Sequence, residues 1–72
     1  MTRKEFLDYV KQRFNLDFDI TEDMDLDMLA NDSIAIMGII SIFNKNSEVK
    51  IKFDDFQNFT SVKDILDKGN FK

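Results

Sequence analysis

The sequence predicts an all-α fold: a small bundle of three main helices and one short helix, with a long first loop. The chain has no Pro and only two Gly among 72 residues, so little interrupts a helix. Apolar residues recur at helical spacing near both ends, and a nearly continuous apolar run lies between them. With 43% hydrophobic and 33% charged residues the chain can fold, and we expect one domain over residues 1–72.

The first helix is expected at about residues 3 to 14. Thr2 and Glu5 have the T-x-x-E spacing of a capping box, in which each side chain bonds the other residue's backbone N–H. Asn15 can end the helix. An apolar stripe at helical spacing defines its buried face: Phe6, Val10 and Phe14.

Residues 15–32 are expected to form a long loop. Their first part alternates apolar and polar residues, but a single strand would have no partner to bond. A brief helical turn is possible between Asp25 and Ala30. We expect apolar side chains to pin the loop to the core: Leu16, Phe18, Ile20, Met24, Leu26, Met28 and Leu29.

The second helix is expected to begin at Ser33, or at Asp32 as its cap, and to run to about Asn46. Nearly every residue from Ile34 to Phe43 is apolar, which is typical of a helix in the centre of a bundle.

A short extended link, Val49 to Phe53, should follow the second helix, and then a short helix at residues 54–59. The last helix begins at Thr60 or Ser61, and Gly69 lies where a C-terminal glycine cap belongs. The predicted core draws on all three main helices: Phe6, Val10, Phe14, Ile40, Phe43, Val62, Ile65 and Leu66.

The residue types exclude several kinds of catalytic and metal site. The chain has no Cys and no His, which removes disulfides, Cys/His zinc sites and Ser-His-Asp or Cys-His catalysis. Asp17-x-Asp19-x-Thr21 begins like a calcium loop, but Glu22 replaces its glycine and Met28 its final Glu. We therefore expect neither an enzyme nor a metal site.

The charge is unevenly distributed along the chain. Seven acidic residues and no Lys or Arg lie between Phe14 and Asn44, while the net charge of the whole chain is −4. Phosphates would be repelled from this segment, so nucleic acid is not expected, and a basic protein surface is the natural partner. The longest apolar stretch is too short to span a bilayer. We expect a soluble, cytoplasmic, monomeric protein.

Ser33 has two interpretations. It can be the N-cap of the second helix, as Asp-Ser before an apolar run often indicates. It can also carry a phosphodiester, because the free N–H groups and the positive dipole end of a helix N-terminus favour an anion.

Asp32-Ser33-Ile34, with Leu29 four residues before the serine, resembles the attachment motif of acyl carrier proteins and peptidyl carrier domains. The order and spacing of the predicted helices and of the long first loop are also similar over nearly the whole chain. The resemblance implies an acyl-carrier-like bundle in which Ser33 receives 4'-phosphopantetheine from coenzyme A, with Asp32 and Ile34 flanking the site. Asp32 would help to position or recognise the site, and Ile34 would anchor the start of the helix.

The implied function is to carry acyl or aminoacyl groups as thioesters on the arm, without catalysis. The implied partners are a phosphopantetheinyl transferase, an acyl- or aminoacyl-loading enzyme, and a downstream synthase or transferase. The lack of Cys agrees with this, since the arm would supply the thiol. The alternative is an unmodified acidic helical module that binds proteins through the second helix.

Two departures from the carrier pattern stand out. Ala30 occupies the position of the motif's usual glycine, and the helix after Ser33 has no acidic residue, whereas carriers of fatty acid biosynthesis usually have glutamates there. The sequence thus leans toward polyketide, nonribosomal peptide or another specialised biosynthesis. We expect partners to contact Asp25 and Asp27 on the loop and Ile36 and Met37 on the helix.

Overall fold

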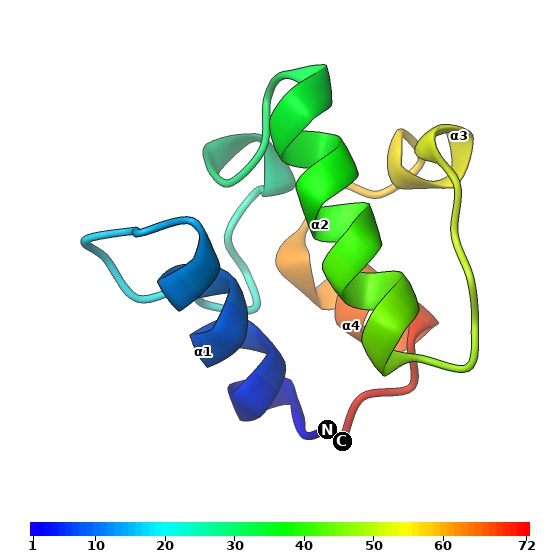
Figure 1. Ribbon diagram of the computed structural model, residues 1–72, viewed down its shortest axis with the longest axis horizontal. Helices are drawn as coiled ribbons and strands as arrows, with labels where there is room; N and C mark the ends of the chain where they lie inside the picture. Colours follow the sequence, from blue (N-terminus) through cyan, green and yellow to red (C-terminus); the bar gives the residue numbers. More distant parts are fainter.

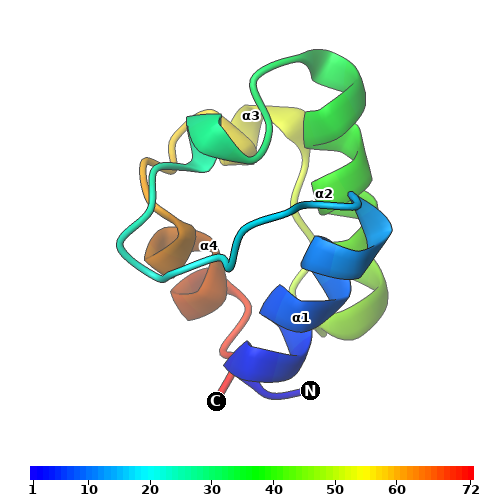
Figure 2. The same ribbon diagram turned by 90° about the vertical axis from the view of Figure 1, so that its left-hand side faces the viewer.

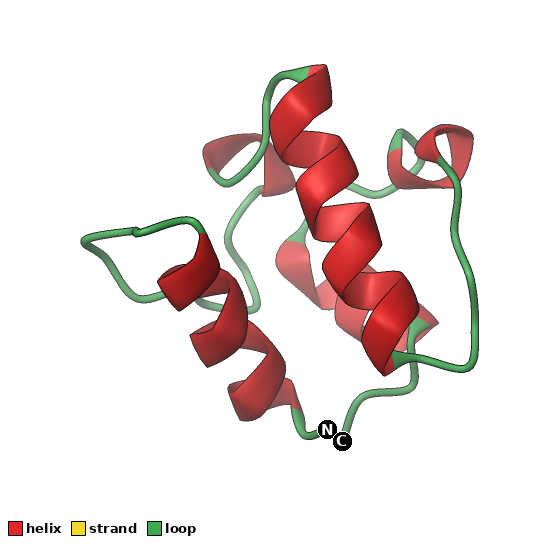
Figure 3. Cartoon of the chain, in the orientation of Figure 1, coloured by secondary structure: helices red, strands yellow, loops and turns green.

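The computed structural model describes residues 1–72 and contains only helices, turns and loops (Figures 1 and 3). This arrangement confirms the predicted all-α class, with three main helices, one short helix and a long first loop. The helical segments in chain order are α1 (Arg3–Arg13), the 3₁₀ turn η1 (Leu26–Met28), α2 (Ser33–Asn46), α3 (Phe53–Phe56) and α4 (Val62–Lys68).

The predicted capping box begins α1. The Thr2 hydroxyl accepts a hydrogen bond from the N–H of Glu5 at 3.1 Å, and the Glu5 carboxylate accepts one from the N–H of Thr2 at 2.8 Å. The bond from the Thr2 backbone is the main reason why the pKa of Glu5 lies below its usual value. At the other end, Asn15 adopts a left-handed conformation with φ of 54°, which ends the helix as predicted.

The core lies between α1, α2 and α4, and α2 and α4 lie on opposite sides of it (Figure 2). Three aromatic rings meet at its centre. The ring centroids of Phe6 and Phe71 are 4.7 Å apart, and Phe43 meets both rings edge-on at 6.5 and 5.8 Å. All the predicted core residues are buried except Phe14, which is partly buried and packs against the core.

The long first loop is fixed by its backbone as well as by its side chains. Residues 22–26 run antiparallel to residues 60–63 and exchange three backbone hydrogen bonds of 2.8–2.9 Å with them. Ile20 and Leu26 are buried, as expected of residues that pin the loop. Met28 is 65% exposed, so the prediction that it pins the loop is wrong.

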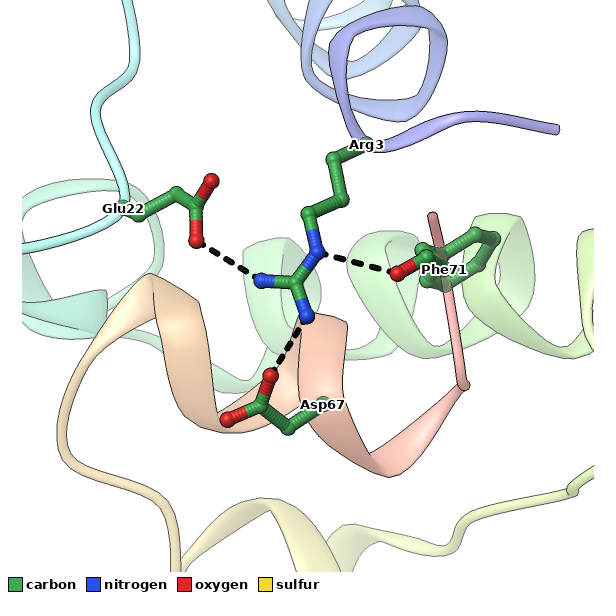
Figure 4. A network of polar contacts seen from close by, with 4 residues as sticks. All are labelled: Arg3, Glu22, Asp67 and Phe71. Carbon is green, nitrogen blue, oxygen red and sulfur yellow. Dashed lines mark hydrogen bonds and ion pairs between the residues drawn. The ribbon is translucent and has the colours of Figure 1, made fainter.

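Arg3 joins four segments of the chain (Figure 4). Its guanidinium donates to Asp67 at 2.6 Å, to Glu22 at 2.7 Å and to the carbonyl of Phe71 at 2.9 Å. The hydrogen bond to Asp67 is the main reason why the pKa of Arg3 is raised. Since these partners belong to the loop, α4 and the C-terminal residues, Arg3 ties both ends of the chain together.

The C-terminal half differs from the prediction in two details. The short helix begins at Phe53 rather than at residue 54 and ends at Phe56, whose ring meets that of Phe59 at 6.4 Å. Gly69 is the C-cap of α4, as predicted, but its φ is −84° and the left-handed residue is Asn70, with φ of 58°. Position 69 therefore needs a glycine because there is no room for a side chain: the rings of Phe43 and Phe71 lie where a Cβ would be.

Candidate functional site

Ser33 is the first residue of α2, where the long loop meets the central helix at the top of Figure 1. Its side chain is exposed and makes no hydrogen bond within the chain. The sequence left open which residue caps the helix, and the structure assigns the cap to Asp32. The Asp32 carboxylate accepts a hydrogen bond from the N–H of Ala35 at 2.8 Å, and the backbone carbonyl of Asp32 accepts one from the N–H of Ile36 at 3.0 Å. The hydroxyl of Ser33 is consequently not used in capping.

The start of α2 also favours an anion. The N–H groups of Ser33 and Ile34 precede the first intrahelical bond and have no acceptor within the chain. The 14-residue helix behind them adds the positive end of its dipole. A phosphate joined to the Ser33 hydroxyl would lie beside both groups.

Ile34 lies on the surface of the protein. It is 86% exposed, so the prediction that it anchors the start of the helix by packing is wrong. Met37, one turn later, is 51% exposed, as expected of a surface residue. Met28, five residues before Ser33, is exposed as well. Ile34 and Met37 therefore form an apolar surface beside the serine on α2.

Ile36 is half-buried and faces away from that surface. It lines a shallow groove of about 320 Å³ between η1, the first turn of α2 and α3. Ala30, which stands in place of the motif's glycine, is 2% exposed and lines the same groove. The other lining residues are Leu26, Asp27, Asn31, Phe56, Gln57 and Phe59.

Exposed acidic side chains lie on the loop that leads to Ser33. Asp25, Asp27 and Asp32 are all exposed, and none of them forms an ion pair within the chain. No three carboxylates gather in a way that could hold a metal ion. None of the helices has both the length and the apolar character needed to cross a bilayer.

The exposure of Met28 and Ile34 was missed from the sequence. A helical wheel centred on Ser33 would have found part of it, because at 100° per residue Ile34 and Met37 lie on the side opposite Ile39 and Phe43. When these residues are treated only as one apolar run, the difference between the exposed and the buried side of the helix cannot be seen.

An exposed serine at the start of the central helix of a small four-helix bundle, after a long first loop, is the arrangement of a carrier domain. Residues 4–68 match the family described as PP-binding, phosphopantetheine attachment site, and the chain belongs to this family. No curated protein and no solved structure is significantly similar to the chain.

Membership of this family defines the class of function. Its members bind 4'-phosphopantetheine covalently and are carrier proteins that hold groups as thioesters on that arm. Carrier domains of this family are not themselves catalysts, and they generally interact with phosphopantetheinyl transferases and synthase enzymes.

Proposed function

We propose that Ser33 is the attachment site of 4'-phosphopantetheine and that the protein carries acyl or aminoacyl groups on it. The observation that carries the proposal is the free hydroxyl of Ser33 at the first position of α2, made available because Asp32 caps the helix. This position lies within the residues that match the family.

The attachment reaction transfers one group from coenzyme A. The Ser33 oxygen attacks the phosphorus that bears the pantetheine arm, a new P–O bond forms, and the bond to the adenosine bisphosphate breaks. The transferase removes the hydroxyl proton and supplies magnesium. The product is a phosphodiester with a single negative charge, which the unpaired N–H groups of Ser33 and Ile34 favour.

We further propose that the protein serves a specialised pathway rather than ordinary fatty acid biosynthesis. The support is that α2 has no acidic residue. Enzymes of fatty acid synthesis would bind this helix through basic patches, which need acidic residues as partners. Asp25 and Asp27 would steer partners toward the serine, Met37 would supply apolar contact, and Ile36 would contribute from the groove side.

The test is intact-protein mass spectrometry after incubation with coenzyme A, magnesium and a broad-specificity phosphopantetheinyl transferase. The wild type should gain one phosphopantetheine, and Ser33→Ala should gain none. Ser41→Ala is the matched control, because Ser41 is another exposed serine on the same helix, and this variant should be modified like the wild type.

Two results would contradict the proposal. If several transferases leave the folded wild type unmodified, the protein is an unmodified interaction module, the alternative that the sequence left open. If Ser33→Ala is modified, another hydroxyl carries the arm.

A further inference from the structure

Three exposed residues of α2 lie in one line along its outer face. Ser41 and Lys45 lie 7 and 11 residues after Ile34, close to whole numbers of turns, and Met37 lies beside that line. All four side chains are exposed. At a rise of about 1.5 Å per residue, Lys45 lies about 16 Å beyond Ile34 along the helix axis.

The two ends of α2 lie near opposite charges. Asp27 and Asp32 lie at the Ser33 end, with no lysine or arginine near them in sequence. At the other end, Lys45 is exposed and forms no ion pair.

Lys50 adds positive charge at the same end of α2. Its ammonium donates to the carbonyls of Asn44 and Ser47, the latter at 2.8 Å, and so offsets the negative end of the helix dipole. Glu48 is the one acidic residue nearby in sequence, and it pairs with neither lysine.

We propose that this face selects partner enzymes whose carrier-binding surface is apolar opposite Ile34 and Met37 and acidic opposite Lys45, and rejects enzymes whose surface is basic there. The inference rests on the proposed function, since it concerns enzymes that approach the serine. A basic patch opposite Lys45 brings like charges together, whereas an acidic group gains an opposite charge. Lys45 is thus a specificity-determining residue.

The size of the effect follows from Coulomb's law. Two unit charges about 8 Å apart in water interact weakly, and reversing one of them changes affinity by about five-fold at low salt. The effect should nearly vanish at about 0.5 M salt, where the Debye length falls well below that separation.

The experiment is a charge exchange with one defined probe enzyme, a fatty-acid-type phosphopantetheinyl transferase that has a basic carrier-binding patch. Its kcat/KM is measured with wild type, Lys45→Glu and Lys45→Gln. The measurement is repeated with an acidic probe, which is the same transferase with Glu in place of the basic patch residue that faces the Lys45 end of α2. Lys63→Glu is the matched control, because it makes the same charge change at an exposed position on α4, across the molecule from α2 (Figure 2).

The proposal expects the preference to cross over. With the basic probe, Lys45→Glu should raise kcat/KM about five-fold over wild type and Lys45→Gln should raise it less. With the acidic probe, wild type should be the better substrate. Lys63→Glu should change neither value more than about two-fold.

Equal gains for Lys45→Glu and Lys63→Glu would mean that net charge alone governs the rate and would overturn the inference, as would no change for either. Failure of the proposed function gives a different result, because a broad-specificity transferase would then leave all variants unmodified. Thermal melts of each variant exclude loss of the fold as the cause.

Discussion

Gly69→Ala is the sharpest test of how the core is packed. Gly69 has an ordinary φ of −84°, so an alanine there meets no backbone strain. Its Cβ would, however, lie 2.5 Å from Cε2 of Phe71 and 2.7 Å from Cε2 of Phe43. Both distances are far inside van der Waals contact, and both rings pack against Phe6. At least one ring must move.

The cost follows from the packing. Overpacking a core costs about 1–3 kcal/mol, and replacing glycine returns up to about 1 kcal/mol by restricting the unfolded chain. We expect a net loss of about 1–2 kcal/mol. A domain of 72 residues holds about 4–11 kcal/mol, so the variant should fold but melt about 5–15 °C lower.

Gly38→Ala is the matched control, and the assay is thermal and urea unfolding followed by circular dichroism. Gly38 lies inside α2, and a Cβ there would lie 3.2 Å from the tip of the half-buried Phe14 ring, which has to move by only a few tenths of an ångström. Removing a glycine from a helix interior gains up to about 1 kcal/mol. Gly38→Ala should therefore melt at or above the wild-type temperature. If Gly69→Ala melts with the wild type, the three rings are not packed as described.

Three further predictions follow from the same structure. Phe43→Ala should cost about 3–5 kcal/mol and leave the protein largely unfolded at room temperature, which a flat melting curve would reveal; a cooperative melt near the wild type would place Phe43 outside the core. Three carboxylates accept hydrogen bonds that lower their pKa values, so their contribution to stability should be fully present above pH about 5 and be lost as acid protonates them. A melting temperature that stays constant down to pH 2 would contradict those bonds. Those carboxylates are Glu5, Asp19 and Asp64. Asp25→Asn with Asp27→Asn should slow association with the transferase at low salt and leave dissociation nearly unchanged in stopped-flow binding, and a wild-type association rate would exclude a steering role for the loop acids.

The helices could be predicted because their boundaries are local. The capping box at Thr2, the left-handed Asn15 and the change to polar residues after Phe43 are all readable within a few positions. The pairing of residues 22–26 with 60–63 could not be predicted, since no local pattern joins segments so far apart in sequence. Phe71 was missed for a related reason: it lies beyond the last helix, and only tertiary packing brings its ring to Phe6.

The candidate site was found from its motif, whereas its surface was only partly predicted. Ser33 and Asp32 stand out in sequence because an acidic and a hydroxyl residue precede an apolar run. The helices α1, α3 and α4 cover only some sides of α2, and an apolar residue on α2 is buried only if it points to one of these sides. Ile34 lies outside that cover, and Ile39 and Ile42 lie within it. An all-apolar run hides this division, because hydrophobicity no longer distinguishes the two faces.

At the start of α2, one residue caps the helix and a different residue offers the hydroxyl: Asp32 is the cap, and the Ser33 hydroxyl is not bonded within the chain. If the Ser33 hydroxyl capped α2, joining a group to it would replace the hydroxyl by an ester oxygen and disturb the bond that begins the helix. Here the N–H of Ala35 donates to the Asp32 carboxylate, and the N–H of Ile36 donates to the backbone carbonyl of Asp32. No hydrogen bond of the first turn therefore involves the atom that would be modified. The start of α2 can stay the same with and without the arm, so the arm would be tethered at a fixed point beside the exposed side chain of Ile34.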